Sequence, residues 1–395
     1  MKILVANLGS TSFKFRLFEM DGEGERVLAK GGYERVEDFG KVISEALEGL
    51  VRDGHLESVD DLEAVGFKTV LGKDLSGCVP ADDKALAALD GLAQIAPAHN
   101  PAYANGIRQF SRLTKARLVA LFETSFYQWI PETARRYAVP ESWYEAGIRR
   151  YGFHGASHKF IAERSAEMLG RSDIGERVRN LYTEGPGEEP EGKPLRVVSC
   201  HLGGSSSVTG ILNGVAIGTS MGLSPQSGLP QNNRVGDLDS MAIPMAMNEL
   251  GLSMEEVLRD LTRQGGLLGL SGVSNDLRDI DAAAADGNPR ARLALDYLVA
   301  SIRHWTGAYA FQMGGLDAIV FTAGIGENRA DIRKGVCAGL EGFGLQLDTS
   351  KNQQPNTGER DIAASGSKIR VLVIPTNEER VVARETWRLM QKKKA

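Results

Sequence analysis

Two stretches of the chain, VANLGSTSF at residues 5–13 and SCHLGGSSS at residues 199–207, decide the fold. Each begins inside or just after an apolar run typical of a buried β-strand, and each places Leu-Gly and then small hydroxyl residues behind that run. A second strand-like segment follows in both places, which predicts a β-hairpin around each glycine-rich turn. Because the two stretches lie about half the chain apart, we interpret them as an internal duplication of one α/β unit.

Two further strand-to-turn junctions lie in the second half of the chain. Residues 317–336 read DAIVFTAGIGENRADIRKGV, and residues 369–390 read IRVLVIPTNEERVVARETWRLM. In each, an apolar run ends in a polar turn and a helical pattern follows. Four such junctions predict an α/β protein that binds its ligands at the strand ends. Residues 172–194 include a stretch dense in Gly, Pro and Glu, which predicts a flexible surface loop there.

Length, composition and charge indicate which classes of protein the chain can belong to. The chain has 395 residues, enough for two or three domains, and its 42% hydrophobic and 25% charged residues are typical of a globular protein. A net charge of −5 argues against general nucleic-acid binding. The apolar run at the N-terminus is too short for an export signal, and no stretch approaches a membrane helix. Three scattered cysteines predict no disulfide framework and fit a reducing cytoplasm.

Glycine is the unusual feature of the composition, with 46 residues gathered beside Ser, Thr, Asn and Asp. Backbone N–H groups in such turns can bind phosphate oxygens, and glycine lacks the Cβ that would block a close approach. Any single turn of this kind is as well explained as a plain tight turn. Several in one chain favour a nucleotide. The pattern GxxxxGK[ST] is absent, so the chain is not a P-loop enzyme.

A few polar residues in glycine-rich settings could carry chemistry. His154 lies in YGFHGASH, four residues before His158, so the two would share a helix face. Arg234, in PQNNRVGDLDS, could present its planar fork to a phosphate or carboxylate, or could be an ordinary solvated arginine. Glu378 and Glu379 follow a strand end and could hold Mg²⁺, or could simply favour a helix N-terminus.

Taken together, the motifs resemble the acetate kinases and related short-chain carboxylate kinases. The resemblance runs along almost the whole chain and rests on NLGSTSFKF (7–15), APAHNP (96–101), FETSF (122–126), YGFHGASH (151–158), HLGGSSS (201–207), TSMGLSP (219–225), GLLGLSGVSNDLR (266–278), FTAGIGEN (321–328) and IPTNEE (374–379). YGFHGASH, FTAGIGEN and IPTNEE, in this order and spacing, are the most specific of these.

The resemblance implies a fold, a ligand set and an assembly. We expect two duplicated ribonuclease H-like domains of the actin, Hsp70 and sugar kinase type, with ATP or ADP in the cleft between them and Mg²⁺ or Mn²⁺ as the metal. One domain would contain residues 1–150 with a returning segment at about 375–395, and the other residues 151–374. We also expect a homodimer.

The resemblance also implies roles for residues that match the family's motifs. Catalytic roles fall on His154, Arg234 and Glu123. Metal binding falls on Asn7 and Glu378. Nucleotide binding falls on Lys14, His201, Leu202, Gly203, Gly204, Ser205, Asp276, Leu277, Arg278, Gly324, Ile325, Gly326, Glu327 and Asn328. Substrate binding falls on Lys68, Val70, Ala98, His99, Phe153 and Pro225.

Departures from the family's pattern gather around the expected acid pocket. The stretch GFKTVLGK (66–73) carries Lys68 where the family has Arg, and Leu71 where it has His. Glu123 replaces an Asp, and Ala98 replaces a Leu. The segment PQSGLPQNNR (225–234) brings in extra polar side chains. Lysine cannot make the two parallel contacts of arginine with a carboxylate, so these changes concern the acid more than the nucleotide.

Three functions follow from these expectations. The first is ATP-dependent phosphorylation of acetate, or of a similar short-chain acid such as propionate, to give an acyl phosphate and ADP reversibly. The second is the same reaction on a larger or more polar acid, favoured by the altered pocket. The third is a catalytically weak nucleotide-binding regulator, which the changes at Lys68 and Glu123 would permit.

Overall fold

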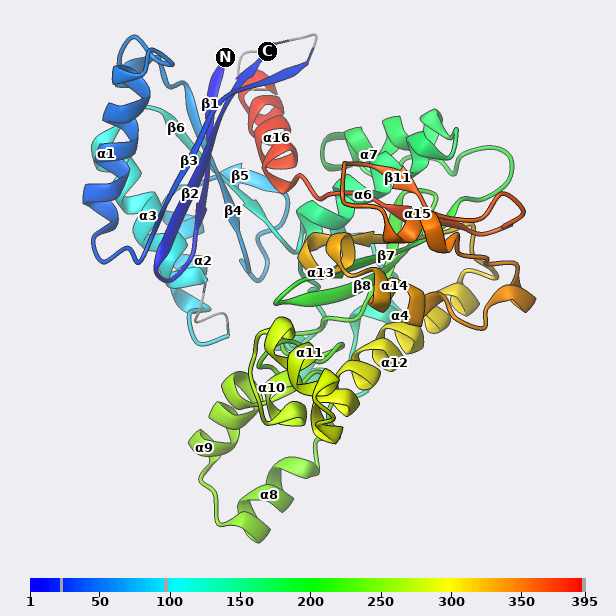
Figure 1. The fold of residues 1–395 in the computed structure, drawn as a ribbon. Coiled ribbons are helices and arrows are strands. Elements are labelled where there is room, and N and C mark those ends of the chain that lie inside the picture. Colours follow the sequence, from blue (N-terminus) through cyan, green and yellow to red (C-terminus); the bar gives the residue numbers. More distant parts are fainter. Residues whose placement is uncertain (22–23, 96–98, 393–395) are drawn as a thin grey trace.

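The computed structural model describes residues 1–21, 24–95 and 99–392, and it contains two six-stranded mixed sheets, one after the other along the chain (Figure 1). Helices cover the faces of both sheets, so the predicted α/β class is confirmed. Within the described ranges, no helix is both long enough and apolar enough to cross a membrane.

The first sheet has the strand order β3-β2-β1-β4-β6-β5. Its strands are β1 (Lys2–Leu8), β2 (Ser12–Met20), β3 (Glu25–Glu34), β4 (Ala64–Thr69), β5 (Cys78–Pro80) and β6 (Arg117–Phe122). Strands β1 and β2 form the predicted hairpin around residues 9–11, while β1, β4 and β6 run parallel. This register places Asn7 opposite Lys14 at the turn end of the hairpin.

The second sheet has the strand order β11-β12-β10-β7-β8-β9. Its strands are β7 (Arg196–Leu202), β8 (Ser206–Leu212), β9 (Val215–Thr219), β10 (Ala318–Thr322), β11 (Arg360–Asp361) and β12 (Arg370–Val373). Strands β7 and β8 form the second hairpin, and β7, β10 and β12 run parallel.

The two sheets match strand for strand. From β3 to β5 in one and from β9 to β11 in the other, the neighbours are antiparallel, antiparallel, parallel, parallel and antiparallel. This common topology confirms the duplication predicted from residues 5–13 and 199–207. The parallel strands end at one edge of each sheet, where ligand-binding loops are expected in this architecture.

Sixteen α-helices and four short 3₁₀ or π segments lie within the described ranges. They are α1 (Phe39–Arg52), α2 (Asp83–Gly91), α3 (Asn100–Leu113), α4 (Glu132–Arg135), α5 (Glu141–Glu145), α6 (Gly155–Met168), α7 (Ser172–Glu184), α8 (Ala242–Leu250), α9 (Met254–Arg259), α10 (Gly266–Ser271), α11 (Leu277–Ala285), α12 (Pro289–Gln312), α13 (Ala323–Asn328), α14 (Ala330–Cys337), α15 (Thr349–Gln353), α16 (Glu378–Lys392), η1 (Val59–Asp61), η2 (Ser125–Tyr127), η3 (Asp260–Gln264) and η4 (Glu341–Phe343).

Strand β1 is buried on both faces, which explains its continuous apolar run. Leu4 and Leu8 face a core built with α1 and α3, while Ile3 and Val5 face a core that includes Val382 of α16. Alternate side chains of a strand point to opposite faces, so one short strand joins both cores. Sheet and helices therefore form three layers in this part of the chain.

Helix α16 returns from the second sheet to the first. It follows β12 in the chain but packs against Gly66 of β4, where a Cβ would lie 2.5 Å from the hydroxyl oxygen of Thr386. Only glycine allows this close approach of helix and strand. The packing supports our proposal that residues 375–395 belong with residues 1–150 and that residues 151–374 form the other domain.

The prediction of a surface loop over residues 172–194 is wrong for residues 172–184, which form α7. Ile174, Val178 and Leu181 recur at helical spacing and are fully buried against α6 and its neighbours. The abundance of Gly, Pro and Glu that indicated a loop is confined to residues 185–194, where no helix or strand forms. Composition averaged over the segment hid the apolar stripe of its first half.

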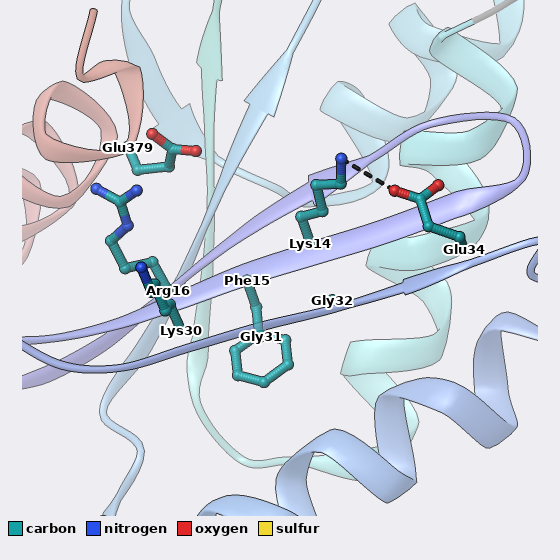
Figure 2. A pocket seen from close by; sticks show the side chains of 8 residues that line it. All are labelled: Lys14, Phe15, Arg16, Lys30, Gly31, Gly32, Glu34 and Glu379. Carbon is teal, nitrogen blue, oxygen red and sulfur yellow. Dashed lines mark ion pairs between the residues drawn. The ribbon is translucent and has the colours of Figure 1, made fainter. Parts of the chain in front are cut away.

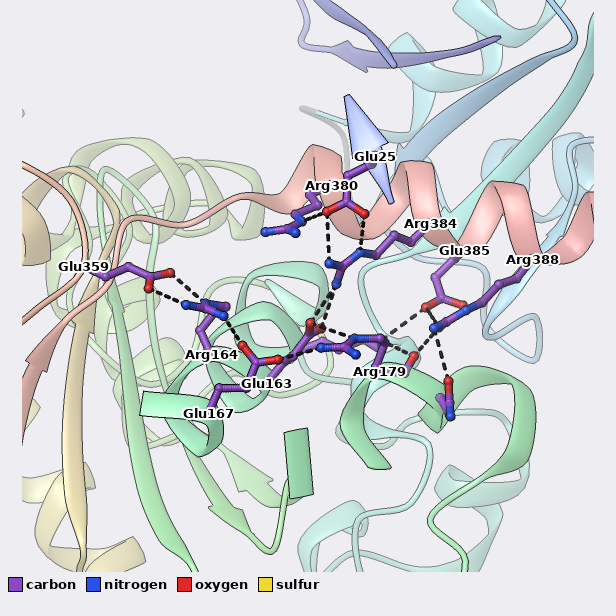
Figure 3. A network of polar contacts seen from close by, with 12 residues as sticks. Glu25, Glu163, Arg164, Glu167, Arg179, Glu359, Arg380, Arg384, Glu385 and Arg388 are labelled. Carbon is purple, nitrogen blue, oxygen red and sulfur yellow. Dashed lines mark hydrogen bonds and ion pairs between the residues drawn. The ribbon is translucent and has the colours of Figure 1, made fainter. Parts of the chain in front are cut away.

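A network of ion pairs joins the two sheets beside α16 (Figure 3). Arg384 on α16 donates to Glu25 on β3 at 3.0 Å and to Glu163 on α6 at 2.8 Å. Glu163 also contacts Arg179 on α7 at 3.2 Å, and Arg164 of α6 continues to Glu359 beside β11 at 2.7 Å. The carboxylate of Glu163 is only 3% exposed, so its charge depends on these partners.

We expect Arg384→Met to lower the free energy of unfolding by about 3 kcal/mol, because it leaves buried carboxylates without a shared cation. Arg26→Met is the matched control, since Arg26 pairs with Glu19 on the surface and is 73% exposed. The control should cost less than about 1 kcal/mol. Urea unfolding followed by circular dichroism measures both. Equal losses in the two variants would contradict a structural role for the network.

Candidate functional site

Three glycine-rich segments meet at the carboxyl ends of the strands of the second sheet. A Cβ at Gly203, in the β7–β8 turn, would lie 3.8 Å from the Cβ of Ala323 at the start of α13. A Cβ at Gly204 would lie 3.3 Å from the side-chain nitrogen of Asn232. The turn at residues 203–205, helix α13 and the loop before Arg234 therefore surround one place, as expected for a nucleotide site.

The predicted nucleotide residues fall into this region in different ways. Gly324 accepts a hydrogen bond from Asn328 at 2.9 Å within α13, and Glu327 accepts one from the backbone N–H of Thr376 at 3.3 Å. The backbone N–H of Gly203 donates to Ser206 Oγ at 3.1 Å. Leu202 is buried. Gly204 and Ser205 belong to the β7–β8 turn, and Ile325 and Gly326 belong to α13.

Asp276 and Arg278 lie at the start of α11. Asp276 caps the helix by accepting from the backbone N–H of Arg278 at 2.9 Å, and the two side chains form an ion pair at 2.5 Å. This arginine lowers the pKa of Asp276 to about 2. Leu277 between them is buried in the core, so its side chain is not free to contact a ligand. An ion pair of Asp281 with Arg329 at 2.7 Å ties α11 to the end of α13.

Lys14 lies on the outer side of the first hairpin, in a hollow of about 450 Å³. Figure 2 shows Lys14 and Arg16 on one side of β2 and Phe15 on the other. Lys14 pairs with Glu34 at 3.0 Å, and Arg16 donates to the Asn377 side chain at 3.2 Å. The predicted phosphate ligand Lys14 therefore lies near the start of α16, with a carboxylate partner that a phosphate would have to replace.

Three histidines gather where α6 crosses β7. The rings of His154 and His201 stack with their centroids 4.0 Å apart. The hydroxyl oxygen of Ser207 lies within hydrogen-bond distance of two ring nitrogens, His154 Nδ1 and His158 Nε2, at 2.8 Å from each. Burial lowers the pKa of all three imidazoles, for His201 to about 4. They are therefore neutral at pH 7, and each has one N–H to donate.

His154 is held in an uncommon backbone conformation. Its φ angle of 59° places it in the left-handed region, at the residue that precedes the first turn of α6. A non-glycine residue there is strained, and such residues often occur at functional sites. Among the described residues, its Nε2 has no hydrogen-bond partner, while its Nδ1 is bound to Ser207. That free nitrogen is available to a ligand, and it is a donor in the tautomer in which Nδ1 accepts from the Ser207 hydroxyl.

A second cluster, built from the first sheet and α16, brings together Lys68, Glu378 and Glu123. Lys68 Nζ lies 2.5 Å from Glu378 Oε2. Burial alone would raise the pKa of Glu378, but Lys68 and His201 outweigh it and lower the value. Burial raises the pKa of Glu123 to about 7, although Lys68 acts in the opposite direction. Both carboxylate oxygens of Glu123 are buried without a hydrogen-bond partner within the described ranges.

Asn7 completes this second cluster. Its side-chain oxygen accepts from the hydroxyl of Tyr103 at 2.9 Å. Asn7, Glu123 and Glu378 offer oxygen atoms only, the ligand type that Mg²⁺ prefers. No group of three His, Cys, Asp or Glu arranged to hold a metal is found among the described residues. Mg²⁺ commonly needs only one or two carboxylates besides phosphate oxygens, and the partnerless oxygens of Glu123 fit such an ion.

Arg234 and His99 lie between the two clusters. Arg234 donates to the carbonyl of Pro225 at 3.0 Å, and burial lowers its pKa. Burial also lowers the pKa of His99 to about 4, and the charges of Arg234 and Lys68 lower it further. The same two cations act on His154. One small region thus contains two neutral imidazoles and two cations that act on both.

The predicted substrate residues divide into three groups. Val70 and Phe153 share one apolar cluster, and the side chain of Asn100 donates to the carbonyl of Leu71 at 3.0 Å, which brings His99 beside Val70. Lys68 is turned toward Glu378 rather than left free for a carboxylate. Ala98 lies outside the described residues.

Several residues of the site carry no signal that the sequence analysis used. Tyr103 reaches Asn7 from the first turn of α3, and Ser207 of β8 links two histidines. Thr376 donates to Ser157, which contacts His201. Thr376 does lie inside IPTNEE, and Ser207 inside HLGGSSS, so a reading of every polar residue in those motifs could have found them.

The raised pKa of Glu123 predicts a pH effect on stability. An unfolded Glu titrates near 4.3, so the folded protein holds this proton more tightly. Folding is therefore favoured at low pH, and the contribution is lost as pH rises toward the folded pKa of about 7. Between pH 5.5 and 8, without divalent cations, the free energy of unfolding should fall by about 2 kcal/mol from this group.

Glu123→Gln keeps the shape and cannot ionise, so it should remove that part of the pH dependence. Glu176→Gln, at an exposed position of α7, is the control. Urea unfolding at pH 5.5, 6.5 and 8 measures the slopes. An unchanged slope in Glu123→Gln would show that this carboxyl is ionised throughout the range.

Comparison with known proteins agrees with this geometry. The model of the acetokinase family matches residues 34–179 and 186–384. The acetate kinase of Shouchella clausii is 40% identical over 98% of this chain and 99% of its own length. Among solved structures, Porphyromonas gingivalis acetate kinase is 33% identical with a TM-score of 0.85, covering 98% of this chain and 99% of that one. The propionate kinase of Francisella tularensis is 31% identical with a TM-score of 0.81, covering 97% and 98%. The chain belongs to the acetokinase family.

Proposed function

We propose that the protein is an ATP-dependent carboxylate kinase that transfers the γ-phosphoryl group of ATP to acetate, or to a similar short-chain acid such as propionate. The products are an acyl phosphate and ADP, and the reaction is reversible. The observation that carries the proposal is the position of Arg234 and the neutral His154 beside the cluster of Asn7, Glu123 and Glu378. Glycine-rich segments suited to phosphates lie next to them.

The charge of each residue determines its proposed role in the transfer. A carboxylate is already ionised at pH 7, so the reaction needs no strong base and depends on positioning and electrostatics. Arg234 and His154 Nε2 donate to the oxygens of the transferring group, where negative charge is spread in the transition state. His99, Val70, Phe153 and Pro225 bound the acid and keep water away from it. Lys68 holds Glu378 and adds positive charge near the carboxylate.

Mg²⁺ or Mn²⁺ would be held by Asn7, Glu123 and Glu378, and would neutralise phosphate charge when bound. We further propose that Lys14, the backbone of residues 201–205, residues 276–278 and residues 324–328 bind the nucleotide. Support for the metal comes from the two buried oxygens of Glu123, which otherwise have no partner among the described residues. The protonated form of Glu123 would have to lose its proton on binding the ion.

We also propose a homodimer formed through α8 and α9. Figure 1 shows these helices projecting from the body of the molecule. They present Met241, Met245 and Leu250 at 68%, 67% and 71% exposure, an apolar patch unusual for a free surface. Sedimentation of the purified chain tests the assembly.

The three cysteines are free thiols, which supports a place in the reducing cytoplasm.

Arg234→Ala should lower kcat about 100-fold or more, the loss expected for one preorganised donor to the transition state. Arg263→Ala, at an exposed position on the neighbouring η3 segment, is the matched control and should keep nearly full turnover. Acyl phosphate formed from acetate and ATP is trapped as the hydroxamate and measured by colour. Turnover close to that of the unaltered protein in Arg234→Ala would exclude the assigned role.

A second candidate function is phosphorylation of a more polar acid at the same site. The side-chain oxygens of Gln226, Gln231 and Asn232 are buried without hydrogen-bond partners in the part of the chain that the structure describes. Gln231 and Arg234 both donate to the carbonyl of Pro225, so Gln231 lies beside the proposed catalytic arginine. A hydroxylated acid would supply the O–H donors that such acceptors lack.

A panel of acids separates the candidates. If the buried acceptors bind substrate, kcat/KM for glycolate or hydroxypropionate should exceed that for acetate and propionate by about tenfold or more. Gln226→Leu should then reduce the preference while leaving acetate turnover unchanged. Activity restricted to acetate and propionate would refute the polar-acid candidate. Tight ATP binding with no acyl phosphate from any acid would instead indicate a regulator.

A further inference from the structure

A groove of about 900 Å³ lies at the edge of the second sheet opposite the candidate active site. It is bounded by the last turns of α12, by residues 314–317 and by the chain around Leu345 and Ile369. Strands β7, β10 and β12 begin here, at Arg196, Ala318 and Arg370, whereas the residues of the candidate site follow their other ends. The groove is therefore separate from the proposed kinase site.

The walls of the groove are apolar and contain two bare aromatic rings. Phe311 of α12 is 91% exposed and Phe343 of η4 is 79% exposed, among the largest values for apolar side chains in the described ranges. Leu345 and Ile369 form the floor and are buried. Gly307 widens the groove, because a Cβ there would meet no atom within 4 Å. Exposed aromatic rings beside such a hollow mark a binding surface.

The rim of the groove carries uncompensated positive charge. Lys193, Arg196, Arg303 and Lys368 line it together with one acid, Asp317. Asp317 is engaged by Lys193 at 2.9 Å and by the backbone N–H of Arg196 at 3.0 Å.

The guanidinium of Arg303 is already used for structure, since it donates to the carbonyls of Gly335, Val336 and Ala338. The guanidinium of Arg196 differs. Its Nε is buried without a partner within residues 1–21, 24–95 and 99–392, and it makes no ion pair there. A guanidinium that has a buried, unpartnered Nε and makes no ion pair, at the side of an apolar hollow, favours an anionic ligand.

We propose that this groove binds a small amphipathic anion, with an aromatic or branched apolar body between Phe311 and Phe343 and one carboxylate, sulfonate or phosphate group on Arg196. The volume lies within the range of pockets for small molecules. The site is independent of the proposed function, because it shares no residue with the kinase site.

Anilinonaphthalene sulfonate tests the proposal, since it combines an apolar aromatic body with one negative charge. Neutral phenylnaphthylamine, which lacks the sulfonate, is the comparison probe. Fluorescence titration of the full chain should show one sulfonate probe bound per chain. Gly307→Phe fills the hollow on an exposed helix face and should weaken both probes about tenfold or more. Phe311→Ser, at a position that carries no packing, should weaken both about threefold to tenfold.

The charge is tested separately. Arg196→Met should weaken the sulfonate probe about tenfold and the neutral probe less than about twofold. Lys334→Gln removes a charge from the exposed side of the nearby helix α14 and is the matched control, with no effect on either probe.

Two results would overturn the proposal. The first is that Gly307→Phe and Phe311→Ser both bind the sulfonate probe as tightly as the unaltered chain does. The second is that Arg196→Met loses affinity for both probes equally. Sedimentation of the same variants supplies a third outcome. If Gly307→Phe converts a dimer to a monomer, the groove is an interface between two copies of the chain and not a ligand site. Circular dichroism melting and kinase activity, which should match those of the unaltered chain, show that each variant is folded.

Discussion

The ion pair between Lys68 and Glu378 joins residues 310 positions apart, and the candidate site depends on it. Lys68 belongs to the first sheet, while Glu378 begins α16 just after the last strand of the second sheet. The pair therefore closes the place where the chain crosses from one half to the other. A contact of Arg16 with Asn377 holds the same crossing from its other side. Because the pair is largely shielded from water, loss of either member would leave a charge without compensation beside Glu123 and the histidines.

Burial sets the chemistry around this pair. Burial lowers the pKa of His154, His158 and His201, so all three are neutral at pH 7. Positive charge is instead placed on Arg234 and Lys68, whose side chains stay protonated at pH 7. Negative charge is carried by Glu378. Hydrogen-bond donors, cations and carboxylates thus occupy separate positions. A phosphoryl group bound between them would experience a preorganised electrostatic field.

Much of this could be predicted from the sequence, because the decisive features are local. The glycine-rich turns at residues 9–11 and 203–205 each predict a β-hairpin, and the similarity of the two turns predicts that the sheet is duplicated. Contacts that depend on distant segments could not be predicted. Nothing near Lys68 in the sequence indicates Glu378 as its partner, and Tyr103 finds Asn7 only once α3 is packed on the first sheet. Helix α7 was missed because a polar, glycine-rich neighbour masked its apolar stripe of Ile174, Val178 and Leu181.

The return of α16 has a consequence for how the chain folds as it is synthesised. Ile3 and Val5 on β1 present one face that α16 covers in the finished molecule. Until residues 378–392 leave the ribosome, the first sheet is complete in its strands but bare on that face. The nascent chain therefore exposes an apolar surface that is prone to aggregation through most of translation. Final docking of α16 covers this face and, in the same event, brings Glu378 to Lys68.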